Sequence, residues 1–241
     1  MTQLFHSIIY QPIYNALIFL YNVVPGHDLG VAIILLTVII RVILYPLAKK
    51  QIESQKKMQE IQPEIKKLQD NYKGDKEKQG KELMKFYKEK KVNPASGCLP
   101  LVVQIIFIIA LYQALVAGIN FSECKDLYTF VACPAKIGTS FLGILNLAKP
   151  SIVLAILTAA AQFAQTKMMM GTMPSAPSGG KADFSQTMNK QMLYLGPILT
   201  LFIGARFPAG LPLYWLVMTL FMIGQQYWVM GHETQKEQIT S

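Results

Sequence analysis

The longest apolar stretches of this chain contain no aspartate and no glutamate. Only 15% of the 241 residues are charged, whereas 52% are hydrophobic, and soluble domains carry nearer a quarter charged residues. Aspartyl intramembrane proteases, carboxylate proton relays and most ion-coupled pumps need a carboxylate within the membrane. The composition therefore indicates an integral membrane protein and argues against these three classes.

Histidine and cysteine are also scarce, with three of each. The histidines lie outside the apolar stretches, and no HExxH, GxSxG, Walker A or GxGxxG pattern occurs. We therefore expect that the protein is not an enzyme and that it has no cofactor and no metal site. Cys124 and Cys133 are nine residues apart in a segment that we expect outside the cytoplasm. An oxidising compartment there either joins them in a disulfide or leaves two free thiols, and both interpretations are open.

Five stretches are about as long as a membrane-spanning helix needs to be. They cover residues 29–48, 98–120, 150–166, 191–206 and 207–231. The predicted fold class is therefore all-α: a polytopic membrane protein with five transmembrane helices, forming a single domain over residues 1–241.

The distribution of lysine and arginine predicts the orientation in the membrane. Residues 49–91 hold 14 of the 23 basic residues, and residues 1–40 hold none. Basic loops stay on the cytoplasmic side, so we expect the N-terminus outside and the C-terminus in the cytoplasm. The segments at 49–97, 167–190 and 232–241 then face the cytoplasm, and the loop at 121–149 lies outside. Because the basic segment also carries eight acidic residues, we expect the lipid bilayer and no nucleic acid as its partner.

The basic segment, residues 49–97, shows two amphipathic helical patterns separated by a break at Asn71–Asp75. A cytoplasmic helical hairpin is predicted, in which Pro63 kinks the first arm or marks a restart of the helix. The hairpin is either a docking device for a partner or a solvated connector.

Residues 4–24 carry no charge and lack the basic region and cleavage site of a secretory signal. Their tyrosines and aliphatic side chains are typical of a helix that lies in the outer membrane interface. A sixth span is the competing interpretation, and Pro12 and Asn15 count against it.

Arg41 is the one charged residue inside the first predicted span. A central arginine costs about 2.5–3.5 kcal/mol on insertion scales, so an intramembrane arginine usually has a function. The alternative is that its side chain extends to the cytoplasmic surface, roughly 10 Å away at helical rise. Thr37 lies one turn earlier on the same helix face.

Glutamines recur in the other predicted spans, at positions 104, 162, 165, 225 and 226. If the faces of Gln104, Gln225 and Gln226 converge with Arg41, they form a hydrated pocket that attracts acidic or polar segments. Alternatively, the glutamines hold helices together by hydrogen bonds worth about 0.6 kcal/mol each.

Three patches of sequence, taken together, are highly specific. They are IIRVILYPLAKKQIESQKKMQEIQPEI, KVNPASGCLPLVVQIIFIIALYQAL, and FPAGLPLYWLV followed by GQQYWV. Their order resembles the YidC/Oxa family of membrane-protein insertases. The resemblance implies a short form without a large periplasmic domain. It also implies a five-span core whose hydrophilic groove opens to the cytoplasm and the lipid but is closed on the outside.

The resemblance assigns roles to several residues. Arg41 matches the groove arginine, Thr37 the polar residue one turn before it, and Trp215 an aromatic residue that contacts clients. The second and fourth spans are implied to form a hydrophobic slide for client helices, with Ile105, Leu111, Leu199 and Phe202 as weaker candidates.

The implied function is that of a membrane-protein insertase and chaperone in the bacterial cytoplasmic (inner) membrane. Nascent membrane proteins are the expected clients, with the Sec translocon and the ribosome as partners. The tail at 232–241 is short and nearly neutral, which argues against ribosome docking through it. A small-solute transporter is a competing class, although no internal repeat is visible. An assembly factor that holds other membrane subunits is a third interpretation.

Overall fold

The computed structural model describes residues 3–72, 74–93, 99–119, 124–170 and 184–240. Its N-terminal elements are α1 (Gln3–Phe5), the π-helical turn η1 (His6–Tyr10), α2 (Gln11–Val23), the 3-10 turn η2 (Pro25–His27), α3 (Leu29–Ile43) and α4 (Tyr45–Glu60). The remaining helices are α5 (Gln62–Asn71), α6 (Lys76–Glu89), α7 (Leu99–Ile119), α8 (Ile152–Met170), α9 (Phe184–Arg206) and α10 (Gly210–Thr240). Two short strands, β1 (Ser140–Phe141) and β2 (Leu145–Asn146), pair antiparallel. The described chain is therefore mostly helical, as the sequence predicts. Residues 171–183 of the predicted loop at 167–190, and Cys98, lie outside the described residues.

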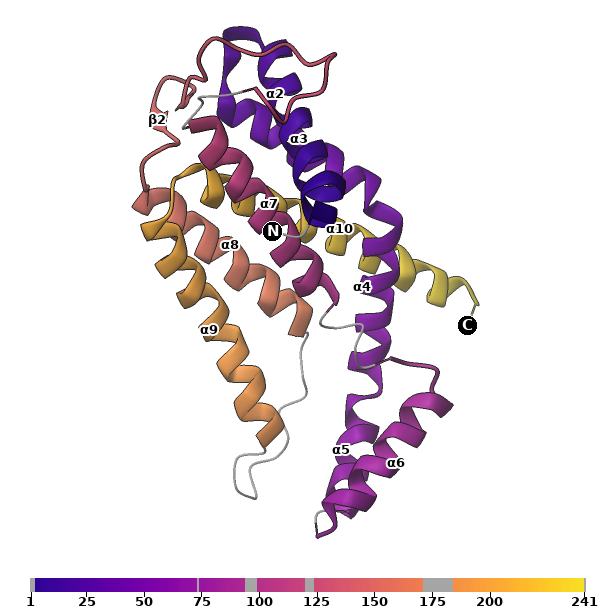
Figure 1. Cartoon of the computed structure of the whole chain (residues 1–241). Helices are drawn as coiled ribbons and strands as arrows, with labels where there is room; N and C mark the ends of the chain where they lie inside the picture. The colour runs from indigo at the N-terminus through magenta and orange to yellow at the C-terminus, as the bar shows by residue number, and fades with distance from the viewer. Residues whose placement is uncertain (1–2, 73, 94–98, 120–123, 171–183, 241) are drawn as a thin grey trace.

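Helix α10 is the centre of the bundle. It packs against α3 on one side and α8 on the other, and α9 covers the far side of α8 (Figure 1). Gly204 allows the close approach of α8 and α9, because a Cβ atom there would lie 3.0 Å from the Cβ of Ala155. The main core runs between the outer halves of these helices and α2, with Leu17, Ile33 and Leu115 among its most buried members.

The bundle presents apolar side chains to its surroundings and keeps many polar groups inside. Exposed residues on α8 and α9 include Ile152, Val153, Ile156, Leu195 and Ile198, whereas Thr158, Thr200, Thr219 and Gln225 are buried. A soluble protein shows the reverse distribution of large apolar groups. Contact with lipid explains it, because acyl chains solvate apolar side chains and leave polar groups to satisfy one another.

One helix among the described residues, Ile152–Met169, is long and apolar enough to cross a membrane by itself. Leu29–Ile43 and Tyr45–Glu60 meet the same criterion only as one span bent by 66°. Gln104–Val116 and Leu193–Arg206 are shorter apolar helices. The count of five spans therefore stays a prediction, because length and composition alone identify fewer.

The first predicted span, residues 29–48, is not one straight helix. Helix α3 ends at Ile43, and Leu44 leaves the regular helical conformation with φ −82° and ψ 0°. Pro46 lies in the first turn of α4, where a proline is tolerated. In one continuous helix it would lie in the interior, where its missing N–H and its ring disrupt the preceding turn. The first span predicted at 29–48 is therefore a bent pair of helices. The fourth, predicted at 191–206, lies within α9, which begins earlier, at Phe184.

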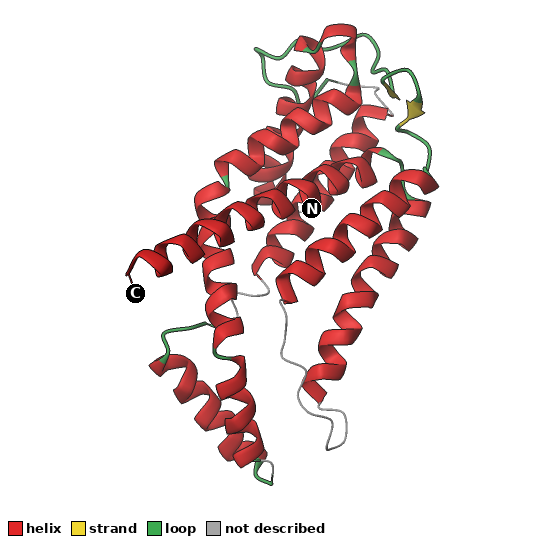
Figure 2. Ribbon diagram, turned by 180° about the vertical axis from the view of Figure 1, so that it is seen from behind, coloured by secondary structure: helices red, strands yellow, loops and turns green. Residues whose placement is uncertain are grey.

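The predicted hairpin is the arm formed by α5 and α6, which projects away from α8 and α9 in both views (Figures 1 and 2). Pro63 lies in the first turn of α5, so the helix restarts there after Ile61. A small core of Ile61, Ile65 and Val92 holds the arm together, with Tyr87 packed against it. Burial raises the pKa of the Tyr87 phenol above its ordinary value.

The N-terminal segment forms a helix that turns π-helical just before Pro12. Proline has no N–H to donate to the preceding turn, and a single π turn is one way in which a helix accommodates this loss. Tyr14, Leu17 and Ile18 of α2 are almost fully buried and belong to the main core. The helix is thus firmly attached to α3 and α7.

Candidate functional site

A cavity of about 70 Å³, open to its surroundings, lies between helices of the bundle. We call this cavity the groove. Its polar lining residues are Arg41, Gln51, Gln55, Gln104, Gln165, Tyr214, Gln225 and Gln226. Its apolar lining residues are Ile40, Leu44, Leu47, Ala48, Ile52, Phe107, Met169 and Met222. Helices α3, α4, α7, α8 and α10 all contribute, so the groove exists only in the assembled bundle.

Arg41 is half-buried in the groove wall, in the last turn of α3. Its Nη2 atom donates to the Sδ atom of Met222 at 3.1 Å and, more weakly, to the Oε1 atom of Gln104 at 3.5 Å. Within the described part of the chain, no aspartate or glutamate forms an ion pair with Arg41. The guanidinium therefore keeps its charge and most of its donors available to a ligand.

The orientation of the Gln104 side-chain amide follows from its contact with Arg41. A guanidinium only donates hydrogen bonds, so the carbonyl oxygen of the Gln104 amide must face Arg41. The Nε2 atom of Gln104 is then buried without a partner among the described residues, and so is the Nε2 atom of Gln225. A buried donor without a partner costs about 1–3 kcal/mol. Both amides would therefore gain from an acceptor inside the groove.

The other glutamines have one of the two expected roles: they line the polar cavity or they join helices by hydrogen bonds. Gln165 and Gln226 line the groove, and Gln165 donates to Met222 Sδ at 3.4 Å. Gln162 instead accepts a hydrogen bond from Thr200, which joins α8 to α9. Gln162 therefore holds helices together, whereas Gln104, Gln165, Gln225 and Gln226 line the polar cavity.

Two predicted groove residues lie outside the lining. Thr37 is 2% exposed, and its hydroxyl donates to the carbonyl of Ile33 within α3 at 2.6 Å. Trp215 packs partly buried against the main core, and Tyr214 takes the place expected for it. Neighbouring residues point about 100° apart around a helix, so Tyr214, a buried member of the main core, lines the groove while Trp215 does not.

Three of the four residues predicted for the hydrophobic slide are exposed. Ile105 on α7 and Leu199 and Phe202 on α9 are exposed apolar residues. Leu111 is 3% exposed and belongs to the main core, so its proposed place on an open face is corrected.

The outer ends of α7 and α9 are joined by an aromatic contact. The rings of Tyr112 and Phe207 meet edge to face, with their centroids 5.4 Å apart. Leu111, next to Tyr112, is buried at this level. This contact brings α7 close to the C-terminal end of α9.

The sequence analysis missed the contribution of α4 to the groove. Leu44, Leu47, Ala48, Gln51 and Gln55 recur at helical spacing on one face. This periodicity is visible in the sequence, but most of α4 lies within the segment predicted as the cytoplasmic hairpin, residues 49–97. The side of a helix that meets a cavity depends on the bend at Leu44, which periodicity alone does not give.

The outer loop is held by polar side chains of α2 that the sequence analysis also missed. Asn15 is 3% exposed. It donates to the carbonyl of Asp126 at 2.8 Å and accepts from the N–H of Tyr128 at 2.6 Å. The Tyr21 hydroxyl accepts from the N–H of Gly138 at 2.7 Å. In the sequence, Asn15 indicates only that residues 4–24 are a poor membrane span; its role in holding the loop depends on the fold.

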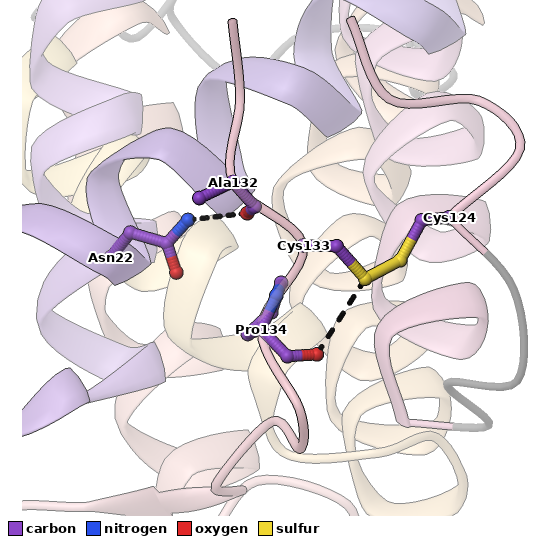
Figure 3. Close-up of a disulfide and its surroundings, with 5 residues drawn as sticks. All are labelled: Asn22, Cys124, Ala132, Cys133 and Pro134. Carbon is purple, nitrogen blue, oxygen red and sulfur yellow. Dashed lines mark hydrogen bonds between the residues drawn. A yellow bond between two sulfur atoms is a disulfide. The ribbon is translucent and has the colours of Figure 1, made fainter. Parts of the chain in front are cut away.

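Cys124 and Cys133 are joined in a disulfide, with their Cα atoms 6.0 Å apart. Next to the bridge, the side-chain amide of Asn22 donates to the carbonyl of Ala132 at 2.7 Å (Figure 3). The small disulfide-closed ring is thus attached to α2 along its length. No group of three or more His, Cys, Asp or Glu residues suited to a metal ion occurs in the described ranges.

Known membrane proteins are similar to this chain over most of its length. Residues 19–237 match the family model described as "60Kd inner membrane protein". "Membrane protein insertase YidC" of Fusobacterium nucleatum is 35% identical over 226 residues, covering 93% of this chain and 98% of that relative. The proteins of the same name in Lawsonia intracellularis and Syntrophobacter fumaroxidans are each 36% identical, over 224 and 212 residues.

The alignments with these two cover 93% and 86% of this chain. They extend over only 39% and 35% of the two longer relatives. The match to the family model and to a relative of almost equal length confirms the resemblance seen in the three sequence patches. The chain belongs to the YidC/Oxa family of membrane-protein insertases.

Proposed function

We propose that this protein inserts other membrane proteins into the lipid bilayer by lowering the barrier that their polar segments meet. The observation that carries the proposal is Arg41, which forms no ion pair within the described ranges and faces a groove lined by glutamine amides. A charge at such a place is costly to keep. It is explained when the groove is hydrated and when a passing polar segment becomes its transient partner.

The arrangement of donors favours clients with hydrogen-bond acceptors. Arg41, the Nε2 atom of Gln104 and the Nε2 atom of Gln225 offer donors to the groove. Carboxylates and backbone carbonyls accept such bonds. A short polar tail that enters the groove therefore exchanges part of its hydration for protein hydrogen bonds instead of losing it to hydrocarbon.

The energy for insertion comes from the client itself. A segment of about 20 apolar residues gains roughly 0.3–0.6 kcal/mol per residue on entering the membrane, or about 6–12 kcal/mol in total. Moving one charged residue to the centre costs about 2.5–3.5 kcal/mol. The gain exceeds the cost for a tail with one or two charges, so no nucleotide is needed once the groove has lowered the barrier.

The client leaves sideways into lipid in this proposal. Ile105 on α7 and Leu199 and Phe202 on α9 are exposed, and an apolar client helix can move along them while the outer contact of Tyr112 with Phe207 stays closed. We infer the topology from the lysine distribution: the α5–α6 arm in the cytoplasm, the N-terminus outside and five spans. The Sec translocon and the ribosome are proposed partners on the family resemblance alone.

Complementation tests the proposed function. The chain is expressed in a bacterial strain depleted of its own YidC/Oxa insertase, and the membrane content of a single-span client is measured. Restoration of growth and of client insertion is expected. Normal accumulation of this protein in the membrane without any client insertion would overturn the proposal.

A further inference from the structure

Helix α4 carries one face of the groove beyond the end of α3. The bend at Leu44 turns α4 by 66° relative to α3. Leu47, Ala48, Gln51 and Gln55 nevertheless continue the same lining as Arg41. The groove therefore extends along α4 toward the cytoplasmic arm.

Contacts at both ends fix this helix against its neighbours. Near its start, the ring of Tyr45 lies 5.9 Å from the ring of Trp228 on α10. Near its end, the side-chain amide of Gln59 donates to the carbonyl of Met169 on α8. Helices α8 and α10 thus flank the extension, and α4 is held as a wall of the groove.

The extension presents amides rather than charges. Lys49 pairs with Glu53, and Lys56 with Glu60, both at 3.8 Å along the helix. Gln51 and Gln55 are half-buried, and neither amide is hydrogen-bonded within the part of the chain that the structure describes. Each amide offers two donors and an acceptor, a combination that suits the N–H and C=O groups of a polypeptide backbone.

The spacing of these amides also suits an extended chain. Residues four apart on a helix are separated by about 6 Å along the axis. Every second residue of an extended peptide recurs after roughly 6.6–6.8 Å, so alternate peptide groups can meet successive amides. We propose that Gln51 and Gln55 form a binding subsite for the backbone of a client's polar segment, which is held there in extended form on its way to Arg41.

The proposal, which rests on the proposed function, predicts a dependence on tail length. Arg41 and Gln55 lie on either side of the 66° bend at Leu44 and are roughly 19 Å apart, and about six extended residues span that distance. A polar segment of about eight residues or more can occupy both places at once. A segment of about three residues reaches Arg41 only after it has left the subsite.

Site-specific photo-crosslinking tests the placement. Benzoylphenylalanine is introduced at Gln51 or Gln55, at Phe107 in the main groove, and at exposed Lys57 on the other side of α4. The full chain in membranes is then illuminated with a stalled single-span client bearing a long polar tail. Adducts at positions 51, 55 and 107 but not at 57 are expected. An adduct at 107 alone overturns the subsite and leaves the proposed function intact, whereas no adduct at 107 contradicts the proposed function itself. Equal adducts at 51, 55 and 57 also overturn the subsite.

A substitution that keeps the shape separates binding from folding. Gln51→Met together with Gln55→Met removes both amides, and Gln62→Met together with Gln69→Met serves as the matched control on α5. We expect about fivefold slower insertion of the long-tailed client, from the loss of two hydrogen bonds, and a change of less than about twofold for the short-tailed client. Equal effects on both clients, or none on either, would contradict the proposal.

Discussion

The Nη2 atom of Arg41 lies 3.5 Å from the Oε1 atom of Gln104, so a charge on α3 meets an amide on α7 across the groove. The second contact of the guanidinium is the thioether of Met222. Neither partner neutralises the charge. Arg41 is therefore a positive charge that faces the groove, and among the residues that the structure describes it has no ion-pair partner to release before a client arrives.

Arg41→Lys should keep much of the insertion activity, whereas Arg41→Ala should lose about tenfold or more. A unit charge about 4 Å from an opposite charge contributes up to ~4 kcal/mol at an effective dielectric of about 20. Lysine keeps that charge but not the planar fork of donors. Growth complementation with both variants at equal membrane levels measures the difference. A lysine variant as inactive as the alanine variant would show instead that the fork geometry is required.

Asn15→Ala should destabilise the outer end of the bundle. The change removes the buried bonds to Asp126 and Tyr128 and leaves backbone groups without partners, which costs about 2 kcal/mol. For a chain of this size, that corresponds to a fall in Tm of about 4–8 °C. Thermal unfolding in detergent measures it, and Asn22→Ala, at a more exposed bond, is the comparison. Equal, small shifts in Tm for both variants would argue against a specific stabilising role of the Asn15 hydrogen bonds.

Loss of the disulfide should loosen the same region by a comparable amount. Cys124→Ser, Cys133→Ser and the double variant should each lose about 2 kcal/mol of stability, because the bridge restricts the unfolded chain. A reducing agent should lower the Tm of the wild type to the same value and leave the double variant unchanged. Cys98→Ser is the control. A wild type whose Tm does not respond to reduction would contradict this prediction.

Gly204→Ala should separate α8 from α9. The added Cβ would lie 3.0 Å from the Cβ of Ala155 and 3.2 Å from its Cα, and overpacking of this kind costs about 1–3 kcal/mol. Combining it with Ala155→Gly should restore most of the lost thermal stability, because the methyl group is moved from one helix to the other. Gly224→Ala, where no atom lies within 4 Å, should be harmless. A double variant less stable than Gly204→Ala alone would refute the packing argument.

The sequence predicted the helical hairpin and its break well, because each arm has one apolar and one polar face. Ile61 and Ile65 form the core of the arm with Val92, and α6 starts after the break, at Lys76. Proline disrupts the interior of a helix but is tolerated in its first turn, so Pro63 indicates where the helix restarts. These are local properties, which periodicity and backbone chemistry determine.

Positions that depend on the rotation of an apolar helix were harder to predict. Helix α7 is apolar apart from Gln104, Tyr112 and Gln113, so little in its sequence shows that Leu111 faces the core while Ile105 faces outward. The groove aromatic was placed at Trp215 instead of Tyr214 for a related reason. Asn15 and Asn22 of α2 bind backbone groups of the loop after α7, more than 100 residues away. Such bonds depend on the fold and leave no periodic pattern.

The central claim is that the groove around Arg41 suffices to insert a client. It is tested most directly by synthesising a small single-span client against liposomes that contain only this purified protein, and then measuring protease protection. The account predicts protection with the wild type, little with Arg41→Ala, and none with empty liposomes. Equal protection by the folded wild type and the folded Arg41→Ala variant would contradict the role of the groove, and no protection by either would contradict autonomous insertion.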